Sequence, residues 1–180
     1  MPEVQILPAV AAHIPLLCAL DASYATDTVW RMDAPRPGES TESGAVFHAM
    51  RLPRRTRVPY PRDIRALEGE WTRLDAVLAA MLNGNPVGFA VLLRGPAPHT
   101  AWVRDVVVGA PWRRQGIGTA LLLAAHRWGR QAGCSRLTME MQPKNFPAIQ
   151  LAEKFGMVFS GYHEHYYAFQ ETALFFTRTL

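Results

Sequence analysis

The segment from Val106 to Thr119, VVVGAPWRRQGIGT, limits the folds open to this 180-residue chain more than any other segment. Three consecutive valines predict a buried strand, because stiff branched side chains suit a pleated environment. Pro111 lacks the N–H group that a strand ladder needs, so the strand should end near Gly109 or Ala110. A helical apolar pattern follows from Thr119 to Gln131. The segment therefore predicts a strand, a loop and a helix in succession.

The loop between this strand and this helix has the features of an anion site. Gly116 and Gly118 let the backbone approach a ligand closely. The N–H groups that begin the helix lie at the positive end of its dipole. Arg113 and Arg114 add positive charge at the same turn. We therefore predict that the loop binds a pyrophosphate group.

Two other phosphate-binding motifs match the loop less well. A P-loop needs a Gly-Lys pair followed by Ser or Thr, and the chain has no Gly-Lys pair. The dinucleotide fingerprint needs a third glycine where Leu121 stands, and its first glycine directly follows the strand. Glu140 nevertheless lies at about the right distance to mimic the ribose-binding acid. A dinucleotide-binding protein therefore stays open as a hypothesis.

The loop sequence resembles the signature of the GNAT family of N-acetyltransferases, Gln/Arg-x-x-Gly-x-Gly/Ala, which is matched by Arg113 to Gly118. A second element of that family is matched by Asn145 to Ile149 and then by Lys154 to Met157. The resemblance is strong over Ala101 to Leu180. Before that, Asp21 to Met32 is similar to a segment of streptothricin acetyltransferases.

The resemblance implies a fold and a cofactor. The fold would be α+β, a mixed and mostly antiparallel sheet flanked by helices, in a single domain over residues 1–180. Acetyl-CoA would be the co-substrate, with its pantetheine arm paired to the valine strand and its pyrophosphate on the loop. The implied cofactor-binding residues are Val106, Val107, Val108, Arg113, Arg114, Gln115, Gly116, Ile117, Gly118, Thr119 and Asn145.

Acetyl transfer to an amine requires a group that takes the amine proton. A lysine-like amine, with a pKa of ~10.4, is almost wholly protonated at neutral pH, so a base matters. Glu140, on a strand predicted from Arg136 to Met141, matches the position of the base in the similar ribosomal-protein N-acetyltransferases. A structural carboxylate bonded to loop N–H groups is an equal alternative. Asp105 is a second candidate, although an ion pair with a nearby arginine is favoured for it.

The general acid departs from the family pattern. The family usually places a tyrosine seven residues after the asparagine, and this chain has Ala152 there. Tyr166 and Tyr167 are the predicted substitutes, because several relatives carry a similar pair at this point. Ala152 also motivates the alternative function of a catalytically impaired acyl-CoA-binding sensor or regulatory protein.

Composition excludes several classes of partner. The net charge of +4 suggests nucleic acid, but the densest basic run, Arg51 to Arg57, reads as a solvated loop with only Tyr60 as an aromatic neighbour. No apolar run approaches the ~20 residues of a membrane span. The start, MPEVQILPAV, lacks the basic region of a signal peptide. We expect a cytoplasmic protein that binds neither nucleic acid nor membrane.

The acceptor is expected to be a cationic amine, either a small molecule or a peptide amine. The N-terminal region has an acidic bias, carried by Asp21, Asp27, Asp33, Glu39 and Glu42. No metal site is expected, because His163 and His165 lack a third ligand and Cys18 and Cys134 are too few. A homodimer is left open.

Periodicity and turn residues predict the remaining elements. Before the valine strand these are a strand Glu3–Leu7, a helix Ala9–Ala22, a mobile loop Ala34–Gly44, a strand Ala45–Leu52, a helix Asp63–Leu74, and a hairpin Ala76–Leu82 and Val87–Arg94. After it come a helix Pro147–Phe155 and strands Val158–His165 and Ala173–Thr179.

Overall fold

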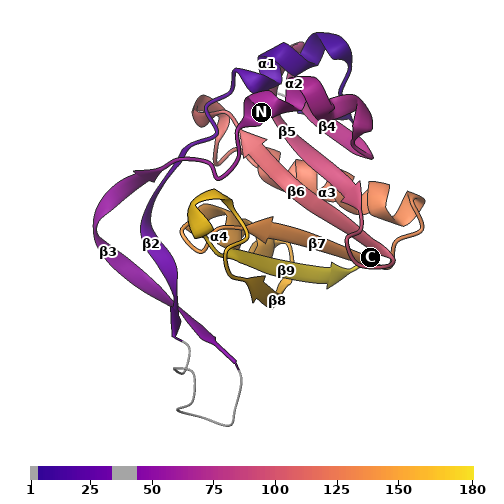
Figure 1. Ribbon diagram of the computed structural model, residues 1–180. Coiled ribbons are helices and arrows are strands. Elements are labelled where there is room, and N and C mark those ends of the chain that lie inside the picture. The colour runs from indigo at the N-terminus through magenta and orange to yellow at the C-terminus, as the bar shows by residue number, and fades with distance from the viewer. Residues whose placement is uncertain (1–3, 34–43) are drawn as a thin grey trace.

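A seven-stranded sheet forms the body of the computed structural model, which describes residues 4–33 and 44–180 (Figure 1). In sheet order its strands are β1 (Gln5–Pro8), β4 (Ala76–Leu82), β5 (Asn85–Arg94), β6 (Thr100–Val108), β7 (Arg136–Met141), β9 (Ala173–Thr179) and β8 (Val158–His163). Among these described strands, β6 and β7 form the one parallel pair. The predicted mixed, mostly antiparallel sheet is confirmed. The sheet also excludes the open parallel sheet of the dinucleotide hypothesis.

Helices cover both faces of the sheet. On one face, α1 (Ile14–Cys18) and α2 (Leu67–Glu70) pack on inward side chains of β4 and β5, such as Phe89. On the other face, α3 (Ile117–Gln131) and α4 (Phe146–Lys154) pack on a second core that includes Phe176. In the described part of the chain, five single-turn 3-10 helices join these elements: Ala11–His13, Ile64–Ala66, Trp71–Arg73, Ala110–Trp112 and Ala168–Gln170.

A β-bulge separates β6 from β7 halfway along their length. The parallel ladder runs from Thr100 to Val103 on β6 and is not continued toward Val108. On the other side of β6, Val103 and Asp105 face consecutive residues of β5, so Arg104 is the extra residue of a bulge. The bulge reverses the side-chain alternation. Val103 therefore faces α3, whereas Val107 faces α1 and α2.

A two-stranded antiparallel ribbon projects from the body (Figure 1). Its strands are β2 (Tyr24–Asp33) and β3 (Val46–Val58). The ring of Trp30 packs 5.5 Å from that of Phe176, and Phe47 packs 5.3 Å from Phe159, centroid to centroid. The N–H group of Trp30 donates to the carbonyl of Pro143 at 2.9 Å. The ribbon is therefore fixed to β8, β9 and the end of β7.

Most predicted elements are confirmed, and the turn between β4 and β5 is the clearest case. Asn83 and Gly84 both have positive φ, +49° and +78°, as the predicted Asn-Gly turn requires. The helix predicted from Ala9 to Ala22 is wrong in length. Pro15 fits only the first turn of α1, and the chain after Cys18 turns toward the ribbon.

Three further predictions differ from the structure or lie outside it. The helix predicted from Asp63 to Leu74 is a succession of three short turns around Gly69. The basic run Arg51 to Arg57 is part of strand β3 and not a loop. The loop predicted from Ala34 to Gly44 lies outside the described residues, apart from Gly44.

None of the helices in residues 4–33 and 44–180 combines the length and the apolar character needed to cross a membrane.

The aromatic contact between ribbon and sheet should contribute strongly to stability. Phe176 is 1% exposed, and Phe176→Ala is expected to lower the free energy of unfolding by about 3–5 kcal/mol, measured by urea denaturation. Leu123→Ala, at a site 48% exposed on α3, should change it by about 0.5 kcal/mol. Equal effects of the two substitutions would contradict this description of the core.

Candidate active site

Glu140 lies on β7 with its side chain wholly buried on the α1 and α2 face of the sheet. Its carboxylate accepts hydrogen bonds from Trp102 Nε1 at 2.5 Å and from the Tyr166 hydroxyl at 2.7 Å. The Tyr167 hydroxyl donates at 3.4 Å, and Arg62 forms an ion pair with the same group. Side chains, and not the loop N–H groups considered as one alternative, therefore hold this carboxylate.

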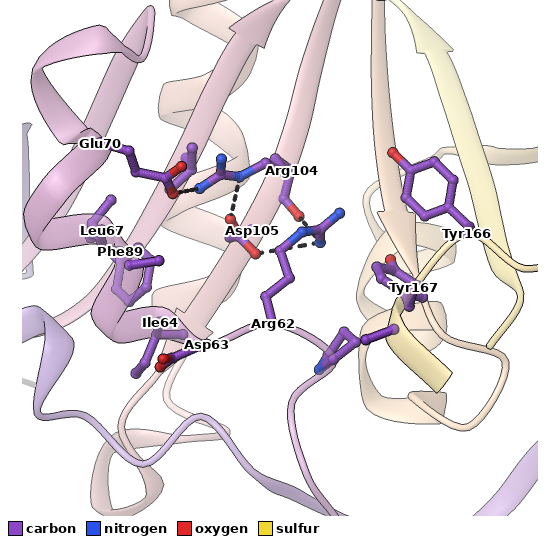
Figure 2. A pocket seen from close by; sticks show the side chains of 14 residues that line it. Arg62, Asp63, Ile64, Leu67, Glu70, Phe89, Arg104, Asp105, Tyr166 and Tyr167 are labelled. Atoms are coloured by element: carbon purple, nitrogen blue, oxygen red, sulfur yellow. Dashed lines mark hydrogen bonds and ion pairs between the residues drawn. The ribbon is translucent and has the colours of Figure 1, made fainter. Parts of the chain in front are cut away.

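Asp105 lies across from Glu140 on the bulged part of β6. It accepts hydrogen bonds from Arg104 Nε at 2.7 Å and from the Tyr60 hydroxyl at 2.8 Å. Arg62 Nη1 lies 3.6 Å from it, and Arg104 also donates to Glu70 at 2.6 Å. The predicted ion pair between Asp105 and a nearby arginine is confirmed. The result is one network of charges that joins β6, β7, α2 and the segment before α2. Figure 2 shows the part of it formed by Arg62, Glu70, Arg104 and Asp105.

A cavity of about 440 Å³ opens beside this network. Its walls come from the segment from β3 to α2, from β5, from the bulged part of β6 and from the β8–β9 loop. The lining residues are Pro61, Arg62, Asp63, Ile64, Ala66, Leu67, Glu70, Phe89, Val91, Arg104, Asp105, Tyr166, Tyr167 and Ala168. Figure 2 shows Tyr166 and Tyr167 on one side of it and Arg104 on the other. Arg62 and the two tyrosines line the cavity and also contact Glu140, which is not one of the lining residues.

Both tyrosines keep their protons at neutral pH. Burial, followed by the hydrogen bond to Glu140, raises the pKa of Tyr166 to about 12. Burial and then the negative charge of Glu140 also raise the pKa of Tyr167. The charged form of a phenol is disfavoured in such surroundings. Because the Tyr166 hydrogen is donated to Glu140 at 2.7 Å, the Tyr166 oxygen can accept a hydrogen bond on its cavity side, whereas the Tyr167 hydroxyl, only 3.4 Å from Glu140, can turn to donate.

The loop before α3 presents its backbone as the sequence predicts. Gly116 is the N-cap of α3 and has a φ of +85°. The first hydrogen bond of the helix runs from the Ala120 N–H group to the Gly116 carbonyl, at 3.0 Å. The preceding N–H groups of Ile117, Gly118 and Thr119 therefore have no helical acceptor. An anion can bind at this helix start.

Arg113 has a different role from the one expected of it. Its guanidinium donates to three backbone carbonyls, those of Val108, Ser23 and Asp21, each at 2.7 Å. The side chain thus joins the end of β6 to the chain before the ribbon. Arg114, which is exposed, is the arginine that gives the loop its outward positive charge.

The predicted cofactor residues lie at one end of the sheet. Because β6 and β7 are parallel neighbours, their carboxyl ends share one edge, where Val106–Val108, the glycine loop and Asn145 meet. Beyond Val103, the side of β6 that faces β7 has no partner among the described strands, so an extended ligand can pair there. Asn145 Oδ1 caps α4 by accepting from the Ala148 N–H group at 3.2 Å, which leaves the amide nitrogen for other contacts.

Sequence reasoning did not find several residues of the site. Arg62 carries no local signal, because it is 78 positions from its partner Glu140. Trp102 could have been found, because the parallel register pairs it with Thr138, which shares a face with Glu140. Ala152 is fully buried within α4, where the family's tyrosine would be expected.

No metal centre is seen in the described part of the chain. Within residues 4–33 and 44–180, no three His, Cys, Asp or Glu side chains are grouped so that they could hold a metal ion. His163 and His165 are exposed. Cys18 is buried and Cys134 half-buried, both as free thiols.

Sequence comparisons relate the chain to acetyltransferases. The profile of the acetyltransferase (GNAT) family matches residues 46–157. An aminoglycoside N(6')-acetyltransferase type 1 of Klebsiella aerogenes is 34% identical over 121 residues, which cover 61% of this chain and 79% of the relative. A streptothricin acetyltransferase of Streptomyces lavendulae is 27% identical over 147 residues, 79% of this chain and 75% of the relative.

Solved structures share the fold. A nourseothricin acetyltransferase superposes with a TM-score of 0.82 at 23% identity, covering 98% of both chains. A Bacillus anthracis protein described as a candidate streptothricin acetyltransferase, solved with acetyl coenzyme A, gives a TM-score of 0.78 at 18% identity. That match covers 99% of this chain and 100% of the other.

The glycine loop can be tested with two glycines at opposite ends of α3. Gly116→Val forces a branched residue to a φ of +85° at the helix start, at a cost of about 1–2 kcal/mol. We expect it to weaken binding of CoA by roughly tenfold or more, measured by calorimetry. Gly133→Val places the same strain, φ +74°, beyond the other end of the helix. It should lower stability and leave CoA affinity unchanged; equal losses of affinity would contradict the assignment.

Proposed function

Because the chain belongs to the acetyltransferase (GNAT) family and is an acetyl-CoA-dependent N-acetyltransferase, we propose that its acceptor is a small cationic amine of the aminoglycoside or streptothricin type. The observation that carries this proposal is the cavity at the bulge of β6, which is bordered by carboxylates and adjoins the open edge of the cofactor strand. A peptide amine is the competing acceptor.

The residues present fit acetyl-CoA, which supplies an activated thioester when bound. The side of the Val106–Val108 backbone that faces away from β5 would hold the pantetheine arm, and the Asn145 amide would contact it. The N–H groups from Arg114 to Thr119 would bind the pyrophosphate at the start of α3. Since the arm and the cavity then meet at the bulge, both substrates can be bound at once, as direct attack in a ternary complex requires.

Glu140 is proposed to receive the amine proton through Tyr166. Glu140 does not border the cavity, but Tyr166 does, and the Tyr166 hydroxyl donates to the Glu140 carboxylate at 2.7 Å. The ammonium form of the acceptor first gives one proton to the Tyr166 oxygen while the tyrosine proton moves to Glu140, and the nitrogen lone pair that this frees then bonds to the thioester carbonyl. The tyrosine is thus unchanged overall, and the carboxylate ends the step protonated.

Tyr167 is proposed to assist the leaving thiolate, the part that a tyrosine at position 152 would play. It borders the cavity and is protonated, because burial raises its pKa. When the C–S bond breaks, the Tyr167 hydroxyl can donate a hydrogen bond to the sulfur, and the second proton of the nitrogen passes to the departing thiolate. A thiol with a pKa of ~8.5 is a mild leaving group, so a modest donor suffices.

The charges around the cavity favour a cationic acceptor. Two guanidinium groups, of Arg62 and Arg104, face three carboxylates, of Glu70, Asp105 and Glu140. The network therefore has one negative charge in excess when its carboxylates are ionised, and Asp63 adds another carboxylate to the wall. Such a surface attracts ammonium groups and repels anions.

The acceptor class can be identified by the release of free thiol from acetyl-CoA. The panel should contain streptothricin, aminoglycosides, polyamines and peptides with free N-termini. We expect turnover with the small polycationic antibiotics. Faster turnover of the peptides would replace this acceptor class by the alternative. No turnover at all, with CoA binding confirmed, would contradict the proposal and favour the acyl-CoA-binding sensor suggested by Ala152.

The proton path predicts a pH-dependent defect in two variants. Glu140→Gln and Tyr166→Phe should each lower kcat at neutral pH by about 10²–10⁴-fold while acetyl-CoA affinity is retained. The defect should shrink at high pH, because the acceptor amine then loses its proton to water. Glu153→Gln, an exposed change on α4, is the control. A defect of equal size at every pH would remove Glu140 as the proton acceptor.

A further inference from the structure

Arg62 is inserted where β6 and β7 part. The last residues paired between these strands are Val103 and Met139. Beyond them, the Arg62 guanidinium lies 3.6 Å from Asp105 on β6 and forms an ion pair with Glu140 on β7. It also donates to the Arg104 carbonyl at 3.5 Å. One side chain from outside the sheet thus bridges the two strands at the start of their separation.

The two carboxylates that Arg62 joins are both out of water. The side chain of Glu140 is 0% exposed and that of Asp105 is 5% exposed. Asp105 has a second cation, Arg104, on its other side. Among the described residues, Arg62 is the one cation paired with Glu140. Without it, a buried carboxylate would be left beside another, and burial would favour its protonated form.

The Arg62 guanidinium also holds the rings of Tyr166 and Tyr167 in position. Its central carbon lies 4.8 Å from the centre of the Tyr167 ring, a cation–π contact. The rings of Tyr166 and Tyr167 in turn meet edge to face, with centroids 5.1 Å apart. The orientation of both hydroxyl groups at the cavity therefore depends on where Arg62 lies.

We propose that Arg62 is a positioning residue for acetyl transfer, which pairs with the buried Glu140 carboxylate and holds Tyr166 and Tyr167 at the cavity by bridging the separated strands. This inference rests on the proposed role of Glu140 as proton acceptor. It assigns a function to a residue that lies outside the cofactor loop and matches no motif in the sequence.

The test compares Arg62→Met and Arg62→Lys with Arg73→Met, a change of an exposed arginine in the same region. The groups that face Glu140 are Arg62, Trp102, Tyr166 and Tyr167, with Asp105 beyond Arg62. Removing the one cation should lower kcat at neutral pH by about tenfold or more. The kcat of Arg62→Met should then rise with pH as the carboxyl ionises, a limb that is absent from the wild type.

Arg62→Lys keeps the charge but cannot span both carboxylates, so it should retain the wild-type pH dependence with a smaller loss of kcat. Arg73→Met should match the wild type. A loss in Arg62→Met that is equal at every pH, or that is confined to the KM for acetyl-CoA, would overturn the proposal. If Arg62→Met fails to fold by circular dichroism, Arg62→Lys decides: an unchanged kcat overturns the proposal, and a lowered kcat at unchanged KM supports it.

Failure of the inference is distinguishable from failure of the proposed function. If Glu140→Gln turns over like the wild type, the role of Glu140 fails, and the Arg62 proposal with it. If Glu140→Gln is impaired while Arg62→Met keeps the wild-type pH profile, only the Arg62 proposal fails. In the Glu140→Gln background, Arg62→Met should add no new pH dependence.

Discussion

The separation of β6 from β7 is the constraint on which the rest of the structure depends. One extra residue, Arg104, bends β6 away from its parallel neighbour after Val103. The separation has two consequences. It leaves the backbone of Val106–Val108 free on one side, so that an extended ligand can pair there. It also turns Asp105 toward the face that carries Glu140, and so brings two buried carboxylates to the point where a cavity opens. The cofactor strand and the candidate acceptor site are thus products of the same bulge.

Burying these carboxylates imposes conditions on distant parts of the chain. A carboxylate that leaves water must be paired and hydrogen-bonded. Trp102, Arg62, Tyr166 and Tyr167 meet that need for Glu140, and they come from β6, from the segment before α2 and from the β8–β9 loop. Three of these side chains, those of Arg62, Tyr166 and Tyr167, also border the cavity, so the contacts of Glu140 determine part of the cavity wall. The contacts that stabilise the buried Glu140 are the same contacts that place it for proton transfer. A substitution at any of them affects both stability and chemistry, so variants must be compared by their pH dependence and not by activity alone.

The features that the sequence predicted well are local. The strand, loop and helix around Gly116 follow from a valine run, a proline and two glycines, and the β4–β5 turn follows from Asn83-Gly84. The resemblance to the GNAT family placed the sheet and is confirmed by the family match. Non-local features were not predictable: Arg62 meets Glu140 across 78 positions. Of the ribbon, only the first half of β3 was predicted, as the strand Ala45–Leu52, and β2 was missed for another reason. Alternating and branched residues from Tyr24 to Asp33 do signal a strand, but its partner β3 contains a basic run that reads as a loop.

The segment that leads into the ribbon makes a second connection between β6 and β7, at the carboxyl ends of the two separated strands. Arg113 holds the Val108 carbonyl at the end of β6 together with the carbonyls of Asp21 and Ser23, just before β2. On the other side of the gap, the Tyr24 hydroxyl donates to Gln142 at 2.8 Å, directly after β7. The chain that begins β2 therefore spans from one separated strand to the other. Arg62 bridges β6 and β7 where the two strands separate, and the segment before β2 bridges them at their carboxyl ends. The distance between the separated strands is therefore fixed at both ends by side-chain contacts and not by strand pairing.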